Sequence, residues 1–172
     1  MPQPAPLPLL FLDVDGPLIP FGPRPGPFPV YPVDGAHGTG GNPLLARIDP
    51  RHGARLAALP CEPVWATTWG QDANTWIRPL LGLPPLPVLD EPEPSATDEQ
   101  DARAGRHWKT RALVARAAGR PFAWVDDEIT AADRTWVAGH HRAPALLHRV
   151  DPGIGLTDGD WTALDRWLRD PR

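Results

Sequence analysis

The sequence is poor in cysteine and in long apolar runs, and each shortage excludes a class of protein. Its 172 residues include one cysteine, Cys61, so no internal disulfide can form and the fold needs no oxidising compartment. The apolar stretch near the start, residues 7–14, is interrupted by Pro8 and Asp13. It is also far shorter than the ~18 residues of a membrane span. We therefore expect a soluble, cytoplasmic protein without membrane contact.

Positive charge is scarce as well. Seventeen basic and 21 acidic side chains give a formal net charge of −4. The chain therefore lacks the broad positive field that draws proteins to nucleic acids or anionic membranes, and a polyanion would have to bind locally. This balance argues against nucleic acid as a partner. Lys109 is the one lysine, and a position kept as lysine among arginines indicates a need for an ammonium group.

Proline and glycine, in contrast, are abundant, with 25 and 16 residues. Such a share approaches that of low-complexity chains, but eight tryptophans and 41% hydrophobic residues can form a core. The length fits one domain. We expect a Pro-rich tail at residues 1–8 and a single domain over 9–172, with a Pro/Gly-rich flap at 16–48 and an acidic loop at 90–101.

The hydrophobic pattern alternates between strands and helices. Short apolar runs predict strands at residues 9–12, 63–67, 86–89, 122–125 and 145–150. Helical spacing predicts helices at residues 49–59, 72–81, 97–119, 131–139 and 158–168. Thr97 and Gln100 have the spacing of a capping box, although Gly105 can delay that helix, and Asp158 is a good N-cap. The alternation predicts an α/β fold, a Rossmann-like three-layer α/β/α sandwich with a mostly parallel five-stranded sheet.

Polar residues stand where three of these strands end. In parallel sheets ligands bind beyond the carboxyl ends of the strands, so these residues are candidates for a site. They are Asp13-Val14-Asp15-Gly16, Thr67-Thr68 and Asp126-Asp127. Lys109 lies on the helix that leads into the fourth strand, 17 residues before Asp126. We expect the four groups to meet at one edge of the sheet.

These residue types indicate phosphoryl transfer. The carboxylates of Asp13, Asp126 and Asp127 repel one another unless a hard dication lies between them, and ligands that are all oxygen favour Mg²⁺. The hydroxyl of Thr67 could hold a phosphate oxygen, and the Lys109 ammonium could neutralise the charge that carboxylate and phosphate share.

The two aspartates of the first motif would then divide the chemistry. Asp13 would attack phosphorus and form an aspartyl phosphate, while Asp15 would protonate the leaving oxygen and then activate water. Because the direction of side chains alternates along a strand, the turn at Gly16 must direct the Asp15 side chain towards the site.

In their order along the chain, the four motifs resemble those of the haloacid dehalogenase-like (HAD) hydrolase superfamily, over roughly residues 9–157. The resemblance implies Asp13 as nucleophile and Asp15 as acid and base. It also implies Thr67, with its neighbour Thr68, and Lys109 as phosphate ligands. Mg²⁺ would be held by the carboxylates of Asp13 and Asp126 and the main-chain carbonyl of Asp15, with Asp127 acting through water.

Only 54 residues separate Asp13 from Thr67, which is too short for a large cap domain, so the resemblance is to a small-cap (C0-type) member with an open site. An open site suits a large substrate or a partner subunit that covers it. Pro17 departs from the family pattern and stiffens the turn beside the first motif.

The resulting hypothesis is a Mg²⁺-dependent phosphatase acting on an unidentified phosphate ester. A metal-dependent nucleotide-sugar transferase built on Asp13-x-Asp15 leaves Thr67, Lys109 and the acidic pair unexplained. A signalling receiver joins the same residue types round Mg²⁺ but in another order. The pair Asp126-Asp127 could also simply cap the next helix, and Pro17 keeps a non-catalytic binding scaffold open.

Overall fold

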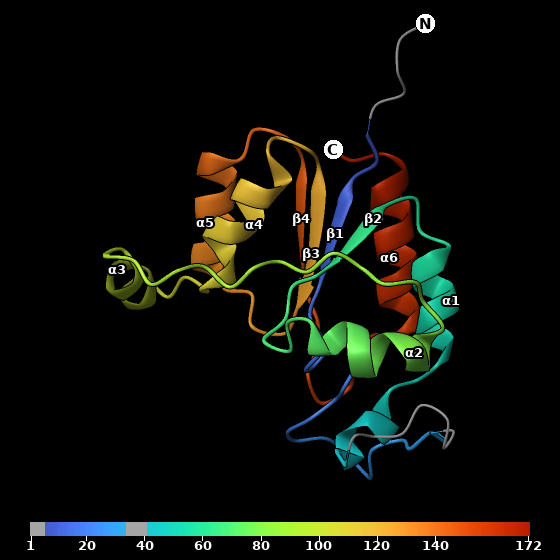
Figure 1. The fold of residues 1–172 in the computed structure, drawn as a ribbon. Coiled ribbons are helices and arrows are strands. Elements are labelled where there is room, and N and C mark those ends of the chain that lie inside the picture. Colours follow the sequence, from blue (N-terminus) through green and yellow to red (C-terminus); the bar gives the residue numbers. More distant parts are fainter. Residues whose placement is uncertain (1–5, 34–40) are drawn as a thin grey trace, which may run out of the picture.

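The computed structural model describes residues 6–33 and 41–172 and has four parallel strands in its sheet (Figure 1). Residues 1–5 of the expected tail and 34–40 of the expected flap lie outside the described part. The strand order is β2-β1-β3-β4, with β1 in the middle of the sheet beside β3. The strands are β1 (Leu9–Leu12), β2 (Glu62–Trp65), β3 (Phe122–Asp126) and β4 (Ala145–Arg149).

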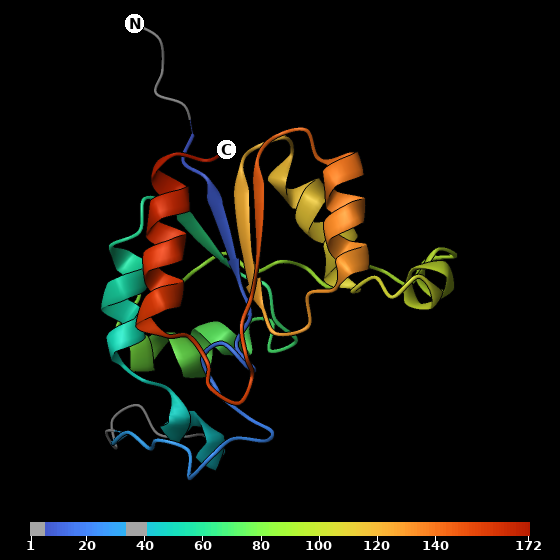
Figure 2. The same cartoon turned by 180° about the vertical axis from the view of Figure 1, so that it is seen from behind.

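Helices cover both faces of the sheet, which gives the three layers that the alternating pattern predicts (Figures 1 and 2). Every residue of β1 and β3 is buried, as the continuous apolar runs require for strands covered on both sides. One face carries α4 (Lys109–Ala117) and α5 (Ala131–His140). The other carries α1 (Arg51–Ala57) and α6 (Asp158–Arg169), with the short α2 (Arg78–Leu81) beside α1.

The expected fifth strand at residues 86–89 is the main difference. In the structure this segment forms only an isolated bridge between Val88 and Trp65. The Trp65 N–H donates to the Pro87 carbonyl, and the Leu89 N–H donates to the Trp65 carbonyl. Pro87 itself has no N–H that could extend this ladder. The sheet therefore has four strands rather than five.

Two of the expected helices are divided. The helix expected at 97–119 is α3 (Asp98–Arg103) followed by α4, with Gly105 between them in the left-handed region at φ +71°. Thr97 makes no side-chain cap bond, so the expected capping box is wrong. The helix expected at 72–81 is a π-helical segment, η2 (Ala73–Ile77), that leads into α2. Pro79 lies in the first turn of α2, where a helix needs no N–H.

The N-cap residues of two helices differ from the candidates that the sequence offered. The N-cap of α6 is Thr157, which forms a capping box with Asp160, and Asp158 is the first helical residue instead. The helix after the acidic pair is capped by Thr130 together with Asp133. The pair Asp126-Asp127 is therefore not that helix's cap and is free for another role.

The flap holds little regular structure in its described residues. They form turns and the short 3₁₀ helix η1 (Pro43–Arg47). None of the helices in the described ranges is long and apolar enough to cross a membrane.

Candidate functional site

Two adjacent strand ends bring Asp13 and Asp126 together. Leu12 of β1 pairs with Val125 of β3, and the N–H of Asp13 donates to the Val125 carbonyl at 3.0 Å. Asp13 is 7% exposed and Asp126 is fully buried. Carboxylate oxygens of Asp13, Asp126 and Asp127 all lie within 4.8 Å of one another. The three residues that the strand ends predicted are therefore a real cluster.

Lys109 is the cation of this cluster. As the first residue of α4 it is 2% exposed, and its Nζ lies 2.7 Å from Oδ2 of Asp126 and 3.1 Å from Oδ2 of Asp13. Removal of an ammonium group from water costs several kcal/mol, which its carboxylate partners offset. The one lysine of the sequence thus occupies a position where a compact charge touches two carboxylates at once.

The cluster holds more negative charge than Lys109 can balance. Burial raises the pKa of Asp13 to about 7, the charge of Lys109 opposes the rise and that of Asp126 adds to it. Burial and the Asp126 carboxylate raise the pKa of Asp127 to about 6. Such an excess of buried carboxylate is what a bound dication relieves, and donors that are all oxygen suit Mg²⁺. The donor set of Asp13, Asp126 and Asp127 therefore fits the metal that the resemblance implies.

Asp126 is held by hydrogen bonds on both oxygens. Its Oδ2 accepts from the Trp124 indole N–H at 3.1 Å as well as from Lys109, and its Oδ1 accepts from the Glu128 backbone N–H at 3.0 Å. No sequence motif indicated this role of Trp124. The available signal was its spacing, since residues two apart in a strand point to the same side.

The turn after β1 places Asp15 and Gly16 around the cluster. Gly16 has φ +90°, and a Cβ built there would lie 2.8 Å from Cγ of Asp127. Glycine is required at this position by both conformation and space. Oδ2 of Asp15 accepts from the indole N–H of Trp69 at 3.0 Å, and Asp15 is not among the clustered carboxylates. Trp69 thus holds Asp15, a contact that no sequence motif indicated.

The two threonines after β2 differ in their surroundings. Thr67 is 5% exposed, and its Oγ1 accepts from the Trp69 backbone N–H at 3.2 Å; its hydroxyl proton has no acceptor within residues 6–33 and 41–172 and can be donated to a ligand. The N–H of Ala66 donates to the Leu12 carbonyl, so Thr67 begins just beyond the last bond between β2 and β1. Thr68 is exposed. Thr67 is therefore the better placed of the two to meet a ligand at this edge.

His107 also lies beside the cluster, although no sequence motif indicated it. A nitrogen of His107 lies within 4.8 Å of carboxylate oxygens of Asp126 and Glu128, which is a spacing compatible with a second metal. However, its Nδ1 accepts the Lys109 backbone N–H at 3.1 Å, so the neutral ring carries its proton on Nε2, which donates to Glu128 at 3.1 Å. A metal-ligating histidine binds the ion through one ring nitrogen and donates its N–H from the other nitrogen. In His107 the nitrogen that would have to donate, Nδ1, is an acceptor instead. His107 therefore supports Lys109 and Glu128 by hydrogen bonds rather than as a ligand.

Comparison with known proteins gives one match. The family model described as "HAD domain in Swiss Army Knife RNA repair proteins" matches residues 9–161. The matched region runs from the first residue of β1 into α6 and includes every site residue described above. No curated protein and no solved structure matches the chain significantly.

Proposed function

Since the chain belongs to this family of HAD domains, we propose that it is a Mg²⁺-dependent phosphohydrolase that removes a phosphate from an RNA strand. The match confirms the resemblance of the four motifs to the HAD-like superfamily, whose members include hydrolases. The observation that carries the proposal is the contact of one buried ammonium, Lys109, with the carboxylates of Asp13 and Asp126.

Asp13 is the nucleophile of the proposal. Its Oδ1 accepts the Val14 backbone N–H at 2.8 Å, and its Oδ2 faces Lys109, so both oxygens are oriented before a substrate arrives. In the first step, an Asp13 oxygen forms a bond to phosphorus while the bond from phosphorus to the ester oxygen breaks. In the second step, water attacks phosphorus and releases phosphate and the free Asp13 carboxylate.

Asp15 is the proton carrier for both steps. With Oδ2 held by Trp69, its Oδ1 is left to give a proton to the departing ester oxygen and later to accept one from water. Thr67 and Lys109 are the proposed donors to the transferred phosphate, because a hydroxyl and an ammonium stabilise the charge that its oxygens carry.

Mg²⁺ would be held by the carboxylates of Asp13 and Asp126, with Asp127 beside them and the main-chain carbonyl of Asp15 as the resemblance implies. When bound, the ion supplies positive charge that lets a phosphate approach the carboxylates. The arrangement of Gly16 against Asp127 keeps these acidic groups close to the turn that carries Asp15.

RNA as the substrate class rests on the matched family, whose members are domains of RNA repair proteins. The net charge of −4 argues against a protein that coats nucleic acid, but a single terminal phosphate needs only local contacts. Arg149 provides one such contact. It lies opposite Asp126 in the register of β3 and β4, is exposed, and uses its Nε on the Asp127 carbonyl, so its terminal nitrogens remain for a phosphate.

The test is phosphate release by wild type and Asp13→Asn, measured with a short RNA carrying a terminal phosphate and with an aryl phosphate, each with and without Mg²⁺. We expect release by wild type with Mg²⁺ and a loss of roughly 10³-fold or more in Asp13→Asn, as for other nucleophile deletions. The matched control is Asp90→Asn, the same change at an exposed position, which should behave as wild type. Equal release by wild type and Asp13→Asn would reject the enzyme and leave the non-catalytic scaffold.

A further inference from the structure

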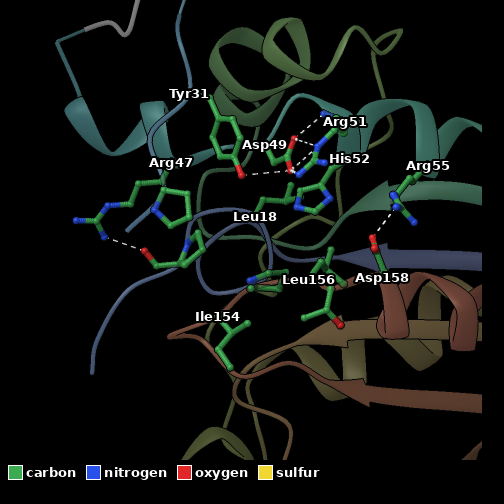
Figure 3. A pocket seen from close by; sticks show the side chains of 15 residues that line it. Leu18, Tyr31, Arg47, Asp49, Arg51, His52, Arg55, Ile154, Leu156 and Asp158 are labelled. Atoms are coloured by element: carbon green, nitrogen blue, oxygen red, sulfur yellow. Dashed lines mark hydrogen bonds and ion pairs between the residues drawn. The ribbon is translucent and has the colours of Figure 1, made fainter. Parts of the chain in front are cut away.

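A cavity of about 230 Å³ lies between the described part of the flap, α1 and the start of α6 (Figure 3). We propose that it binds one nucleotide unit of the substrate strand, with the phosphate at its arginines and the base on its apolar wall. This proposal rests on the proposed function, which supplies RNA as the substrate class. The cavity is not lined by any of the residues to which the phosphoryl transfer has been assigned.

The cavity adjoins the carboxylate cluster through Gly16. On one side, the position of a Cβ at Gly16 is occupied by Asp127. On the other side, the loop before α6 packs on the same turn: Leu156 N–H donates to the Pro17 carbonyl at 2.9 Å, and a Cβ at Gly155 would lie 3.4 Å from the Gly16 carbonyl oxygen. Pro17 and Leu18, which line the cavity, follow Gly16 directly in the chain. The proposal therefore places the terminal phosphate of a strand at the cluster and the adjacent nucleotide unit in the cavity.

Three arginines line the cavity at four-residue intervals. Arg51 and Arg55 lie one turn apart on α1 and so share a face of that helix, whereas Arg47 is the last residue of η1 and lines the cavity from there. Among the described residues, Arg47 bonds through one nitrogen to the Pro20 carbonyl and Arg55 through one nitrogen to Asp158, so within this part of the chain each keeps further N–H groups for a ligand. Arg51 uses two nitrogens on Asp49 and its side chain remains 78% exposed. Free guanidinium donors beside a cavity are suited to phosphate oxygens.

His52 adds an N–H donor to the cavity, and its hydrogen bond with Trp161 fixes which ring nitrogen carries the proton. Its Nδ1 accepts the indole N–H of Trp161 at 3.1 Å, and because an indole nitrogen only donates, the neutral His52 ring carries its proton on Nε2. Burial lowers the pKa of His52, which keeps the ring neutral. No hydrogen-bond partner for Nε2 is found among the described residues, so this N–H is available to a phosphate, ribose or base oxygen.

Part of the remaining wall is apolar, and the two aspartates that pair with the arginines also line it, together with a threonine. Leu18 and Leu156 are buried, whereas Ile154 is 53% exposed and stands across the cavity from Tyr31 and Arg51 (Figure 3). Apolar walls with a few oriented polar groups are typical of sites for small ligands, whose volumes run from roughly 300 to 1,000 Å³. The smaller cavity here limits its occupant to a single nucleotide unit.

The experiment measures binding in the absence of Mg²⁺, so that it does not depend on turnover. The probe is a fluorescently labelled short RNA with a terminal phosphate, titrated with wild type, Arg55→Ala and Ile154→Trp at several salt concentrations. Asp158, the partner of Arg55, is 88% exposed, so water can solvate its carboxylate when the Arg55 guanidinium is removed. Position 154 is exposed, so a tryptophan there can be accommodated and should fill the cavity. Arg116→Ala removes an exposed arginine of α4 as the matched control.

We expect Kd to rise about tenfold in Ile154→Trp and several-fold in Arg55→Ala, with Arg116→Ala within twofold of wild type. The slope of log K against log salt should fall by about 0.7 in Arg55→Ala, the value of one phosphate contact to a single strand. Adenosine monophosphate should displace the RNA from wild type, and inorganic phosphate at the same concentration should not.

Three results would overturn the nucleotide cavity: equal Kd values in Arg55→Ala, Ile154→Trp and Arg116→Ala, displacement by inorganic phosphate as strong as by the nucleotide, or no RNA binding by wild type. Thermal unfolding of each variant identifies a change in Kd that comes from misfolding. If Ile154→Trp is misfolded, the salt slope of Arg55→Ala decides whether the cavity contacts a phosphate. Failure to release phosphate from both the RNA and an aryl phosphate with Mg²⁺ would instead reject the proposed phosphohydrolase and leave the binding result standing.

Discussion

Lys109 and Asp126 form the closest ion pair of the buried cluster, with Nζ 2.7 Å from Oδ2, and the same Nζ lies 3.1 Å from Asp13. One side chain at the start of α4 thereby joins the ends of two neighbouring strands. Because these groups are buried, the contact should affect both the free energy of unfolding and the release of phosphate, and the two effects can be measured separately.

Lys109→Met keeps the length of the side chain and removes its charge. We expect it to abolish phosphate release and to lower the free energy of unfolding by about 3–5 kcal/mol without metal, since it leaves two buried carboxylates unpaired. Chemical denaturation measures the second effect. Mg²⁺ should restore part of the lost stability, and a variant as stable as Arg116→Met without metal would contradict this role of Lys109.

Gly16→Ala tests the close approach of Gly16 and Asp127. Gly26 is the control, because it also has a positive φ but nothing lies within 4 Å of its Cβ position. Gly26→Ala should cost about 1–2 kcal/mol from backbone strain alone. Gly16→Ala should cost a further ~1–3 kcal/mol and lose activity, because its methyl group displaces Asp127. Equal unfolding free energies for the two variants would show that the contact is unimportant.

His107→Asn and His107→Ala test the bond that positions Lys109. Asparagine can accept a backbone N–H two residues on, as the Nδ1 of His107 does, whereas alanine cannot. We expect His107→Asn to keep most of the unfolding free energy and His107→Ala to lose about 1 kcal/mol. The kcat of His107→Ala should fall more than its KM changes, since a displaced Lys109 stabilises the transition state less. Identical kinetics for the two variants would count against this role.

Cys61 should react slowly with thiol reagents. Burial raises the pKa of its thiol to about 12, so at pH 8 it is protonated and a poor nucleophile. Its labelling rate in the native protein should be far below that of the same protein in denaturant, and should rise with pH up to the point of unfolding. Equal rates in both states at pH 8 would contradict the burial of Cys61.

Asp101 should make stability depend on pH in the acid range. Hydrogen bonds from Arg111 hold the pKa of Asp101 below its ordinary value of 3.8. Its contribution is therefore complete above that ordinary value and is lost as the pH falls through the lower folded value. Asp101→Asn should lower Tm at pH 7, and the difference from wild type should shrink below about pH 3.8. A difference that stays constant between pH 7 and pH 3 would argue against an ionised Asp101 as its cause.

The fold could be predicted from sequence where apolar runs are continuous and end at a polar residue. Residues 9–12 and 122–125 are such runs, and both lie in buried strands, the second of which extends by one residue to Asp126. The prediction was wrong at 86–89, where local pattern favours a strand but prolines remove the N–H groups that a ladder needs. It was incomplete at 97–119, where Gly105 separates two helices.

The sequence by itself determined which groups meet at the edge of the sheet, because the carboxyl ends of adjacent parallel strands converge whatever the loops do. Asp13 and Asp126 are together for that reason. Only the tertiary structure decided what holds them and what lies beside them: Trp69 on Asp15, the tautomer of His107, and the cavity between α1 and α6. These depend on contacts between segments far apart in the chain, and the periodicity of one element does not show which distant segment its side chains will meet.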